Sequence, residues 1–259
     1  MSLRQLFPPG APSGADPDLA ALYAYPDRLW LRANMVSSAD GAASADGLTA
    51  GLSSATDRRL VSLLRTLSDV IIAGAATVRA ERYESVRIRE LWRDLRAGRP
   101  PTPPIAVVSA RLDLDPDGPL IAAAPAHART IVITGAAAPA DRRAALARQA
   151  DVIVAGGETV DLQAAVAALA ERGHRRLLAE GGPRLLAQLA GAGLMDELCL
   201  TIAPLMAGPG ASRIVAGERP AGPPVPLTLA HVLEDDGSLH CRYTTKDHCY
   251  RTGRVTRPG

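Results

Sequence analysis

The sequence predicts an α/β fold, with a central, mostly parallel sheet flanked by helices and a C-terminal antiparallel hairpin. Short apolar runs of strand length alternate with helical patterns along most of the 259 residues, and such alternation is typical of a parallel sheet covered on both faces. Near the C-terminus a short polar turn joins two apolar segments directly, which indicates a hairpin. A composition of 47% hydrophobic and 22% charged residues is that of a globular protein with a substantial core.

Each element of this fold has its own signal in the sequence. Continuous apolar runs predict strands at residues 30–36, 70–74, 105–108, 131–133, 152–154, 176–179 and 198–202. Helical spacing of apolar residues, or a helix start after a strand, predicts helices at residues 57–67, 76–81, 141–149, 162–170 and 183–190. The hairpin pairs residues 227–233 with 239–245 across the turn 234–238.

We expect one domain over residues 25–246 to contain all of these elements. The proline- and glycine-rich start of the chain predicts a flexible N-terminal lead-in over residues 1–24, and the polar, basic end predicts a flexible tail over residues 247–259. The arginine-rich segment 82–104 is typical of an insertion, with a helix around residues 88–95. We expect its charges to form a solvated face.

Bulk properties exclude several classes of function. A net charge of +2 gives no electrostatic support for binding to nucleic acid or a membrane surface, and no apolar run reaches membrane-spanning length. The three cysteines lack Cys-x-x-Cys spacing, which fits a reducing cytoplasm. Lys246 is the only lysine, so neither a lysine Schiff base nor a lysine-containing phosphate loop is expected. The five histidines lack ligand spacing, and we predict that they are surface or partly packed residues and that there is no metal site.

The most informative segment, residues 178–188, joins a strand end to a helix start through a glycine pair. Glu180 ends the strand, the two glycines permit positive φ and close approach of a ligand, and Pro183 suits the first turn of a helix. Free backbone N–H groups between Gly181 and Leu185, together with the positive end of the helix dipole, predict a phosphate-binding site. A tight turn with no ligand explains the same pattern equally well.

Four segments, taken in order, resemble the motifs of one family. They are Asn34-Met35-Val36-Ser37-Ser38-Ala39-Asp40-Gly41, Ala73-Gly74-Ala75-Ala76-Thr77-Val78-Arg79-Ala80-Glu81, Glu180-Gly181-Gly182-Pro183 and Asp196-Glu197-Leu198-Cys199-Leu200-Thr201-Ile202-Ala203-Pro204. The chain resembles the riboflavin-biosynthesis pyrimidine reductases, the reductase half of bifunctional deaminase–reductases, from about Leu29 to Tyr243. Stand-alone actinobacterial members without the deaminase half are the most similar. The resemblance implies a dihydrofolate reductase-like fold and a homodimer, for which the apolar segment 194–206 is a candidate interface strand.

The resemblance also implies NADPH as the hydride donor, with the protein supplying orientation and electrostatics. It assigns Val36 and Gly51 to the nicotinamide side and the turn after Glu180 to the pyrophosphate. The cofactor-binding residues that it implies are Val36, Gly51, Gly74, Thr77, Glu81, Ser109, Gly181, Gly182, Pro183, Arg184 and Leu185. For Val36, ordinary strand packing is the alternative.

On the substrate side, the resemblance implies Thr49, Arg65, Arg87 and Glu180, around a pyrimidine that carries a ribose phosphate. Arginine can pair with a phosphate through two hydrogen bonds. Arg65 faces mainly away from the apolar stripe of its helix, so a solvated arginine is the alternative there. Glu180 could accept a hydrogen bond from a pyrimidine N–H; its alternative is a carboxylate satisfied by amides of the turn.

Asp57 has two interpretations from the residues alone. It shares a helix face with Val61 and Leu64, where partial burial would disfavour its ionised form. Such a carboxyl group would suit proton donation or the binding of a pterin. Alternatively, Ser54-x-x-Asp57 is a capping-box-like start in which Asp57 satisfies helix amides. Asp40 and Asp46, each followed by glycine, are expected to form turns.

Three functions remain open. The first is an NADPH-dependent reductase of 5-amino-6-(5-phosphoribosylamino)uracil or a related ribosylamino-pyrimidine phosphate, with Glu180, Arg65 and Thr49 orienting the substrate and Asp57 or water managing the proton. The second is a reductase of dihydrofolate or another pterin on the same fold, with Asp57 as the essential acid. The third is a catalytically silent nucleotide-binding protein.

Overall fold

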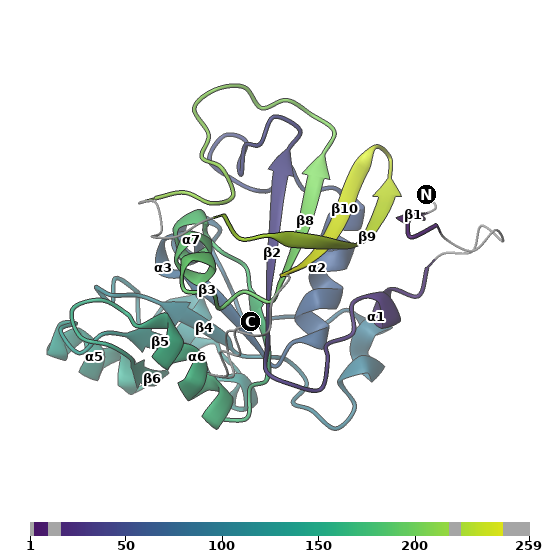
Figure 1. Cartoon of the computed structure of the whole chain (residues 1–259). Coiled ribbons are helices and arrows are strands. Elements are labelled where there is room, and N and C mark those ends of the chain that lie inside the picture. Colours follow the sequence, from purple (N-terminus) through teal and green to yellow (C-terminus); the bar gives the residue numbers. More distant parts are fainter. Residues whose placement is uncertain (1–2, 10–16, 218–223, 246–259) are drawn as a thin grey trace, which may run out of the picture.

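A computed structural model describes residues 3–9, 17–217 and 224–245 of the chain, and within these residues ten strands form one sheet (Figure 1). The strands are β1 (Arg4–Phe7), β2 (Trp30–Ser38), β3 (Val70–Gly74), β4 (Ile105–Val108), β5 (Ile131–Thr134), β6 (Asp151–Val154), β7 (Arg176–Ala179), β8 (Glu197–Ala203), β9 (Leu227–Asp235) and β10 (Ser238–Thr245). Their order across the sheet is β1-β9-β10-β8-β2-β7-β3-β4-β5-β6. From β8 to β6 neighbouring strands are parallel, whereas β10, β9 and β1 are antiparallel additions. The predicted fold class is confirmed.

Helices connect the parallel strands. They are α1 (Leu19–Leu22), α2 (Ala55–Leu67), α3 (Ala75–Ala80), α4 (Pro119–Ala122), α5 (Ala140–Ala147), α6 (Leu162–Glu171) and α7 (Pro183–Gly191), with the 3₁₀ segments η1 (Glu90–Arg96) and η2 (Ala126–Ala128). In the described part of the chain, none of them has the length and apolar character needed to cross a bilayer.

Alternate residues of β3 belong to two different cores, one on each face of the sheet. In β3, Val70 and Ile72 belong to the core beneath α6 and α7, whereas Ile71 and Ala73 belong to the core beneath α2. This alternation follows from the period of two in a strand. Strand β7 is apolar toward both helical layers, with Leu177 in one core and Leu178 in the other, which explains its continuous hydrophobic run in the sequence. In Figure 1, α7 and α6 lie in front of the sheet and α2 lies behind it.

The N-terminal segment is part of the fold rather than a free lead-in. Residues Arg4–Phe7 form β1, which pairs with β9. Leu3 and Tyr23 are buried with 5% and 2% of their surface exposed. The prediction of a flexible lead-in over residues 1–24 is therefore wrong for these parts, because apolar side chains separated by the proline-rich stretch both reach the core. The flexible tail expected at 247–259 lies outside the described residues.

The arginine-rich insertion is partly structural. The helix expected around residues 88–95 is the 3₁₀ segment η1, and Arg96 at its end is buried rather than solvated. Its Nη1 donates to the carbonyls of Thr66 and Ser68, both at 2.8 Å. These groups lie at the C-terminal end of α2, where a cation complements the helix dipole and satisfies free carbonyls.

A buried ionic network joins the parallel and antiparallel parts of the sheet. Arg32 on β2 and Glu197 on β8 have no exposed side-chain surface, and Arg32 Nε lies 2.6 Å from Glu197 Oε1. Arg242 on β10 donates to the same carboxylate at 2.8 and 3.0 Å, and Trp30 Nε1 donates at 2.8 Å. Burial alone would favour the neutral acid, yet the two guanidinium groups lower the pKa of Glu197 from 4.5 to about 2.

Replacing this carboxylate should destabilise the whole fold. We expect Glu197→Gln to lower the free energy of unfolding by roughly 3–5 kcal/mol, because it leaves buried guanidinium charge without a counter-ion. The pKa of Glu197 is lower in the folded state, so its contribution is present above about pH 4.5 and is lost as the pH falls toward about 2. Urea denaturation at neutral and acid pH measures both effects. The free energy of unfolding of the variant should fall less between neutral and acid pH than that of the wild type.

The matched control is Glu90→Gln, since Glu90 forms an exposed pair with Arg93 and its side chain is 77% exposed. This variant should change the free energy of unfolding by no more than about 0.5 kcal/mol. Equal effects of the two substitutions would contradict a role for the buried network.

Candidate functional site

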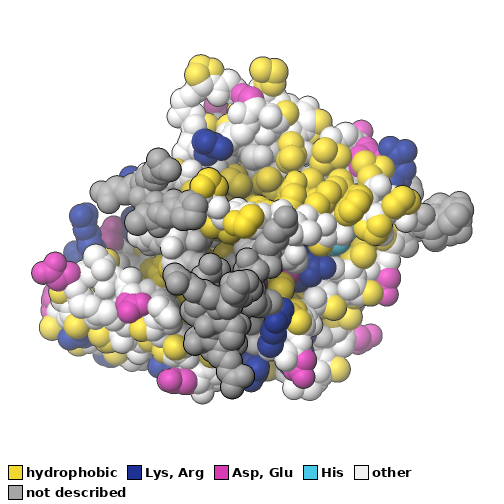
Figure 2. Space-filling model, viewed as in Figure 1, with side chains coloured by type: hydrophobic (Ala, Val, Ile, Leu, Met, Phe, Trp, Pro, Cys, Tyr) yellow, Lys and Arg dark blue, Asp and Glu magenta, His cyan; other side chains and the backbone are white. Residues whose placement is uncertain are grey.

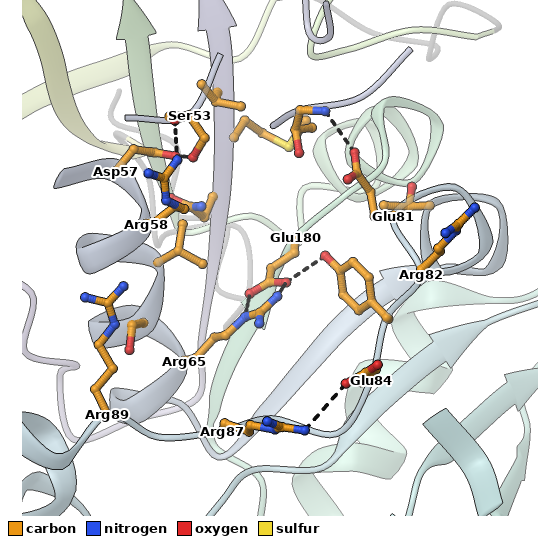
Figure 3. A pocket seen from close by; sticks show the side chains of 18 of the residues that line it. Ser53, Asp57, Arg58, Arg65, Glu81, Arg82, Glu84, Arg87, Arg89 and Glu180 are labelled. Carbon is orange, nitrogen blue, oxygen red and sulfur yellow. Dashed lines mark hydrogen bonds and ion pairs between the residues drawn. The ribbon is translucent and has the colours of Figure 1, made fainter. Parts of the chain in front are cut away.

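A cavity of about 730 Å³ opens at the carboxyl edge of the parallel strands, between α2 and the segment that follows α3 (Figure 3). Strand β2 and the end of β7 form its floor. Eight of the residues singled out from the sequence line it: Val36, Thr49, Asp57, Arg65, Thr77, Glu81, Arg87 and Glu180. Ligands of open α/β sheets bind at this edge, and the cavity volume is in the range of small-molecule sites.

An ion pair lies at the base of the cavity. Arg65 donates through Nε and Nη2 to Glu180 Oε1 and Oε2, at 2.6 and 2.7 Å. The Tyr83 hydroxyl donates to Oε2 at 2.8 Å. The Glu180 side chain is only 5% exposed, and that of Arg65 is 29% exposed. Neither alternative from the sequence describes these two residues: Arg65 is not a solvated arginine, and Glu180 is held by side chains rather than by amides of the turn.

Asp57 lies in the first turn of α2 with 3% of its surface exposed and lines the cavity. The helix is capped by Ser54, whose side chain accepts from the backbone N–H of Asp57 at 3.0 Å. The Asp57 carboxylate itself accepts from the Ser53 hydroxyl. Ser54 therefore caps the helix, a role that the second interpretation had assigned to Asp57. The Asp57 side chain lies in the cavity wall instead.

Positive charge gathers around the mouth of the cavity. Besides Arg65 and Arg87, the lining includes Arg58, Arg82 and Arg89, all exposed. The Arg87 side chain is 91% exposed and lies 3.8 Å from Glu84. Sequence reasoning missed Arg58, Arg82, Arg89 and Tyr83. In the segment after α3, arginines alternate with other residues. This pattern could have indicated a charged cavity mouth, but we expected these charges to form a solvated face.

The glycine pair after Glu180 packs closely against its neighbours. Gly181 has φ +85°, and a Cβ there would lie 3.1 Å from Met35 Sδ. A Cβ on Gly182 would lie 2.4 Å from Thr77 Oγ1, and the Gly74 N–H donates to the Gly181 carbonyl at 2.8 Å. The turn thus brings together residues 74, 77, 181 and 182 from two strand ends, and the packing alone requires glycine at position 182.

Helix α7 starts directly at this turn. Gly182 is its N-cap without a side-chain cap, and Pro183 is in its first turn. Leu185 is 5% exposed and packs into the core, so only its backbone can face a ligand. The Pro183 carbonyl accepts from Ala216 N at 3.3 Å, and Arg184 lies beside Gly217. The loop after β8 therefore runs next to the helix start.

Hydrogen bonds link the loop between β2 and α2 to other parts of the site. The Thr49 amide donates to Glu81 Oε1 at 3.0 Å, which ties this loop to the end of α3. Asp40 accepts from the Ser38 hydroxyl and from the amides of Ala207 and Gly208. These bonds lower the pKa of the Asp40 carboxyl to about 2. Asp40 is thus more than a turn former, since it joins the loops that follow β2 and β8.

Eight of the eleven predicted cofactor residues lie outside the cavity lining: Gly74, Gly181, Gly182, Pro183, Arg184 and Leu185 at or beside the glycine turn, and Ser109 and Gly51 elsewhere in the chain. Ser109 follows β4 and is buried, and its amide donates to the Ile133 carbonyl at 2.9 Å. Gly51 lies in the loop between β2 and α2, where a Cβ would be 3.0 Å from Ala45 Cβ. Both positions belong to the same edge of the sheet as the glycine pair.

Two histidines differ from the sequence prediction. His231 and His240 on the terminal hairpin are each 2% exposed, and burial lowers the pKa of His231 to about 4. His240 lies 2.9 Å from the Thr201 hydroxyl through Nδ1. Among the described residues, no group of three or more His, Cys, Asp or Glu side chains could hold a metal ion.

Residues 29–241 match the family model described as the RibD C-terminal domain. This chain belongs to the RibD C-terminal domain family. A relative from Archaeoglobus fulgidus, named 2,5-diamino-6-ribosylamino-4(3H)-pyrimidinone 5′-phosphate reductase, is 32% identical over 70% of this chain and 83% of its own length. A relative of the same name from Methanothermobacter thermautotrophicus is 31% identical over 74% of this chain and 85% of its own length.

One solved structure is similar to this one over most of its length. A protein of Corynebacterium diphtheriae, described as pyrimidine reductase-like, superposes with a TM-score of 0.80 at 28% identity. The alignment covers 88% of this chain and 98% of that protein. The family match over residues 29–241 includes every residue that lines the cavity.

The close contact at Gly182 gives a direct test of the site geometry. We expect Gly182→Ala to destabilise the protein by about 1–3 kcal/mol, because the new methyl group overlaps the Thr77 hydroxyl. Thr77→Ala removes that oxygen, so the double variant should regain most of the loss. Urea denaturation of the two single variants and the double variant measures this coupling. If the losses in the free energy of unfolding of the two single variants simply add in the double variant, the contact between Gly182 and Thr77 would be contradicted.

Proposed function

We propose that this chain catalyses the NADPH-dependent reduction of a ribosylamino-pyrimidine 5′-phosphate to its ribitylamino form, a step of riboflavin biosynthesis. The observation that carries the proposal is the Arg65–Glu180 pair at the base of a polar cavity, directly beside a glycine turn that opens a helix. Both curated relatives carry names of reductases of this kind, and their similarity supports the same chemistry here.

The glycine turn and the strand ends beside it fit a dinucleotide. The first amides of α7 point out of the helix start, where they and the helix dipole favour a diphosphate. Thr77 and Glu81 line the cavity next to this turn. Arg111, two residues after Ser109, is exposed and is of the residue type that accommodates a 2′-phosphate. Reduced nicotinamide, when bound, supplies a hydride to C1′ of the ribose.

The substrate would lie across Glu180 with its phosphate toward the arginines at the mouth. Glu180 is ideally placed to accept an N–H of the pyrimidine. Because Arg65 already donates two hydrogen bonds to Glu180, we assign the phosphate to Arg58, Arg87 and Arg89 instead. Within the described residues Arg89 has no ion-pair partner, and exposed guanidinium groups pair well with phosphate.

Asp57 is the best-placed proton donor in the cavity wall. The reaction breaks the bond between C1′ and the ring oxygen, and hydride at C1′ and a proton at that oxygen complete the ribityl chain. A buried carboxyl group can hold and deliver such a proton, and Ser53 orients it through its hydrogen bond. Water that enters the open cavity can restore the proton.

We further propose a homodimer that uses the uncovered face of β8 and β10. Leu200, Ile202, Leu239 and Tyr243 share this face, each is only partly buried, and α6 and α7 do not extend over it. Figure 2 shows hydrophobic side chains gathered over β8, β10 and β9. Such an apolar surface is typical of an interface between copies, and it contains part of the segment 194–206.

The assay that tests the function compares three substrates with purified protein and NADPH. We expect oxidation of NADPH with the 2,5-diamino-pyrimidinone or with 5-amino-6-(5-phosphoribosylamino)uracil, and none with dihydrofolate. Asp57→Asn should lower kcat by roughly 10²–10⁴-fold because the proton donor is lost. Loss of NADPH absorbance measures the rate.

Asp46→Asn is the matched control for Asp57. Asp46 is exposed in a turn at φ +51°, a backbone conformation that asparagine tolerates, and it does not line the cavity. This variant should keep kcat unchanged. Turnover of dihydrofolate alone would replace the proposal with a pterin reductase, and NADPH binding without any turnover would replace it with a silent nucleotide-binding protein.

Disruption of the apolar face tests the dimer. Ile202→Glu should weaken self-association by about 100-fold or more, because a two-fold interface would bury the new carboxylate twice. Leu91→Glu is the control, since Leu91 is 57% exposed on η1, away from this face. Sedimentation velocity should detect a wild-type dimer and a monomeric Ile202→Glu variant. A wild-type protein that sediments as a monomer would contradict the dimer.

A further inference from the structure

We propose that Tyr83 is a positioning residue that fixes the Glu180 carboxylate so that a single acceptor position remains for the pyrimidine. This inference rests on the proposed function and goes beyond it, because the sequence motifs of the family did not single out Tyr83. The residue lies in the segment after α3, beyond the last residue of the motif that ends at Glu81. Tyr83 and Glu180 both line the cavity, and the Tyr83 hydroxyl lies 2.8 Å from Glu180 Oε2.

The backbone holds Tyr83 firmly in place. Helix α3 ends with Glu81 as its C-cap, and the chain then reverses at Arg82 with φ +50°. The Tyr83 amide donates back to the Val78 carbonyl at 3.0 Å. Its side chain is therefore anchored to the end of a helix, and the hydroxyl is presented to Glu180 from a defined direction.

The hydrogen bond between Tyr83 and Glu180 has a fixed polarity. Burial, followed by the charge of Glu180, raises the pKa of Tyr83 well above its ordinary value. The phenol thus keeps its proton at neutral pH and donates it to Oε2 at 2.8 Å. A donor to a carboxylate stabilises the charged acceptor, and such bonds are stronger than neutral ones.

A count of lone pairs shows what this bond leaves available. An ionised carboxylate offers about four acceptor positions, two on each oxygen. Arg65 occupies one on Oε1 and one on Oε2, and Tyr83 occupies the second position on Oε2. Only one position on Oε1 remains, so Glu180 can accept one N–H from a bound pyrimidine, in a direction set by its two partners.

The aromatic ring has a second and separable contact. The Arg65 guanidinium lies over the Tyr83 ring at 5.5 Å from its centre, near the outer limit of a cation–π interaction. Phenylalanine would keep this contact and the packing of the ring. Tyr83→Phe therefore removes the hydroxyl alone, and any effect on substrate binding reports the hydrogen bond to Glu180.

The first measurement compares the steady-state kinetics of the wild type and Tyr83→Phe. We expect KM for the pyrimidine to rise about tenfold, the size of one charge-assisted hydrogen bond, while kcat stays within about twofold because the bond acts on binding in the ground and transition states alike. The dissociation constant for NADPH, from fluorescence titration, should not change.

The second measurement repeats the comparison in a Glu180→Gln background. If Tyr83 acts through Glu180, Tyr83→Phe should raise KM there by less than about twofold, since coupled residues are not additive. A merely structural tyrosine would raise KM equally in both backgrounds. Tyr25→Phe is the matched control, because the Tyr25 hydroxyl donates to the Leu177 carbonyl at 3.2 Å and does not line the cavity. It should leave KM unchanged.

The outcomes separate this inference from the proposed function. An active wild type whose KM is unaffected by Tyr83→Phe would overturn the role of Tyr83 and leave the proposed function intact. Equal increases in KM on Tyr83→Phe in the wild-type and Glu180→Gln backgrounds would overturn the role of Tyr83 in the same way. A wild type that reduces neither pyrimidine would overturn the proposed function, and with it this inference.

Discussion

The bidentate ion pair between Arg65 and Glu180 ties the two walls of the cavity together. Arg65 belongs to α2, on one face of the sheet, and Glu180 follows β7 at the sheet edge. A carboxylate that is only 5% exposed needs a counter-ion and hydrogen-bond donors. The position of α2 relative to the sheet and the orientation of the Glu180 side chain thus depend on one contact. The shape of the cavity depends on it too, because α2 forms one wall and carries Asp57, Arg58, Val61, Ser62 and Arg65 of the lining.

This contact has a chemical consequence for substrate binding. An arginine that donates two hydrogen bonds to a buried carboxylate has little left for a phosphate, and removing it would leave Glu180 as an uncompensated charge. Under the proposed function, the pyrimidine and the phosphate therefore bind at separate places in the cavity. The carboxylate and the tyrosine lie at the base, whereas exposed arginines lie at the mouth. The cavity can hold the ring rigidly and still admit a charged group through its opening.

Most of the fold could be predicted from the sequence because its signals are local. The runs at 70–74 and 105–108 are strands with the expected bounds, since buried parallel strands are apolar throughout. Strand β1 could not be predicted, because its pairing with β9 links residues 230 positions apart. The 3₁₀ form of η1 and the burial of Arg96 depend on carbonyls at the end of α2, and a periodicity analysis does not include such partners.

The same distinction applies to the site: its glycine turn has a local signal in the sequence, whereas the partners of Glu180 do not. Glycines and a proline at 181–183 are visible locally, because a strand end followed by a helix start constrains them directly. What Glu180 touches is decided by Arg65 and Tyr83, which lie 115 and 97 residues away. From the sequence, Glu180 was expected to accept from a pyrimidine N–H or, alternatively, from amides of its own turn, and the tertiary structure gives it an arginine and a phenol as partners. A side chain next to a motif can thus be identified from the sequence, whereas the number of acceptor positions it keeps for a ligand follows only from its partners in space.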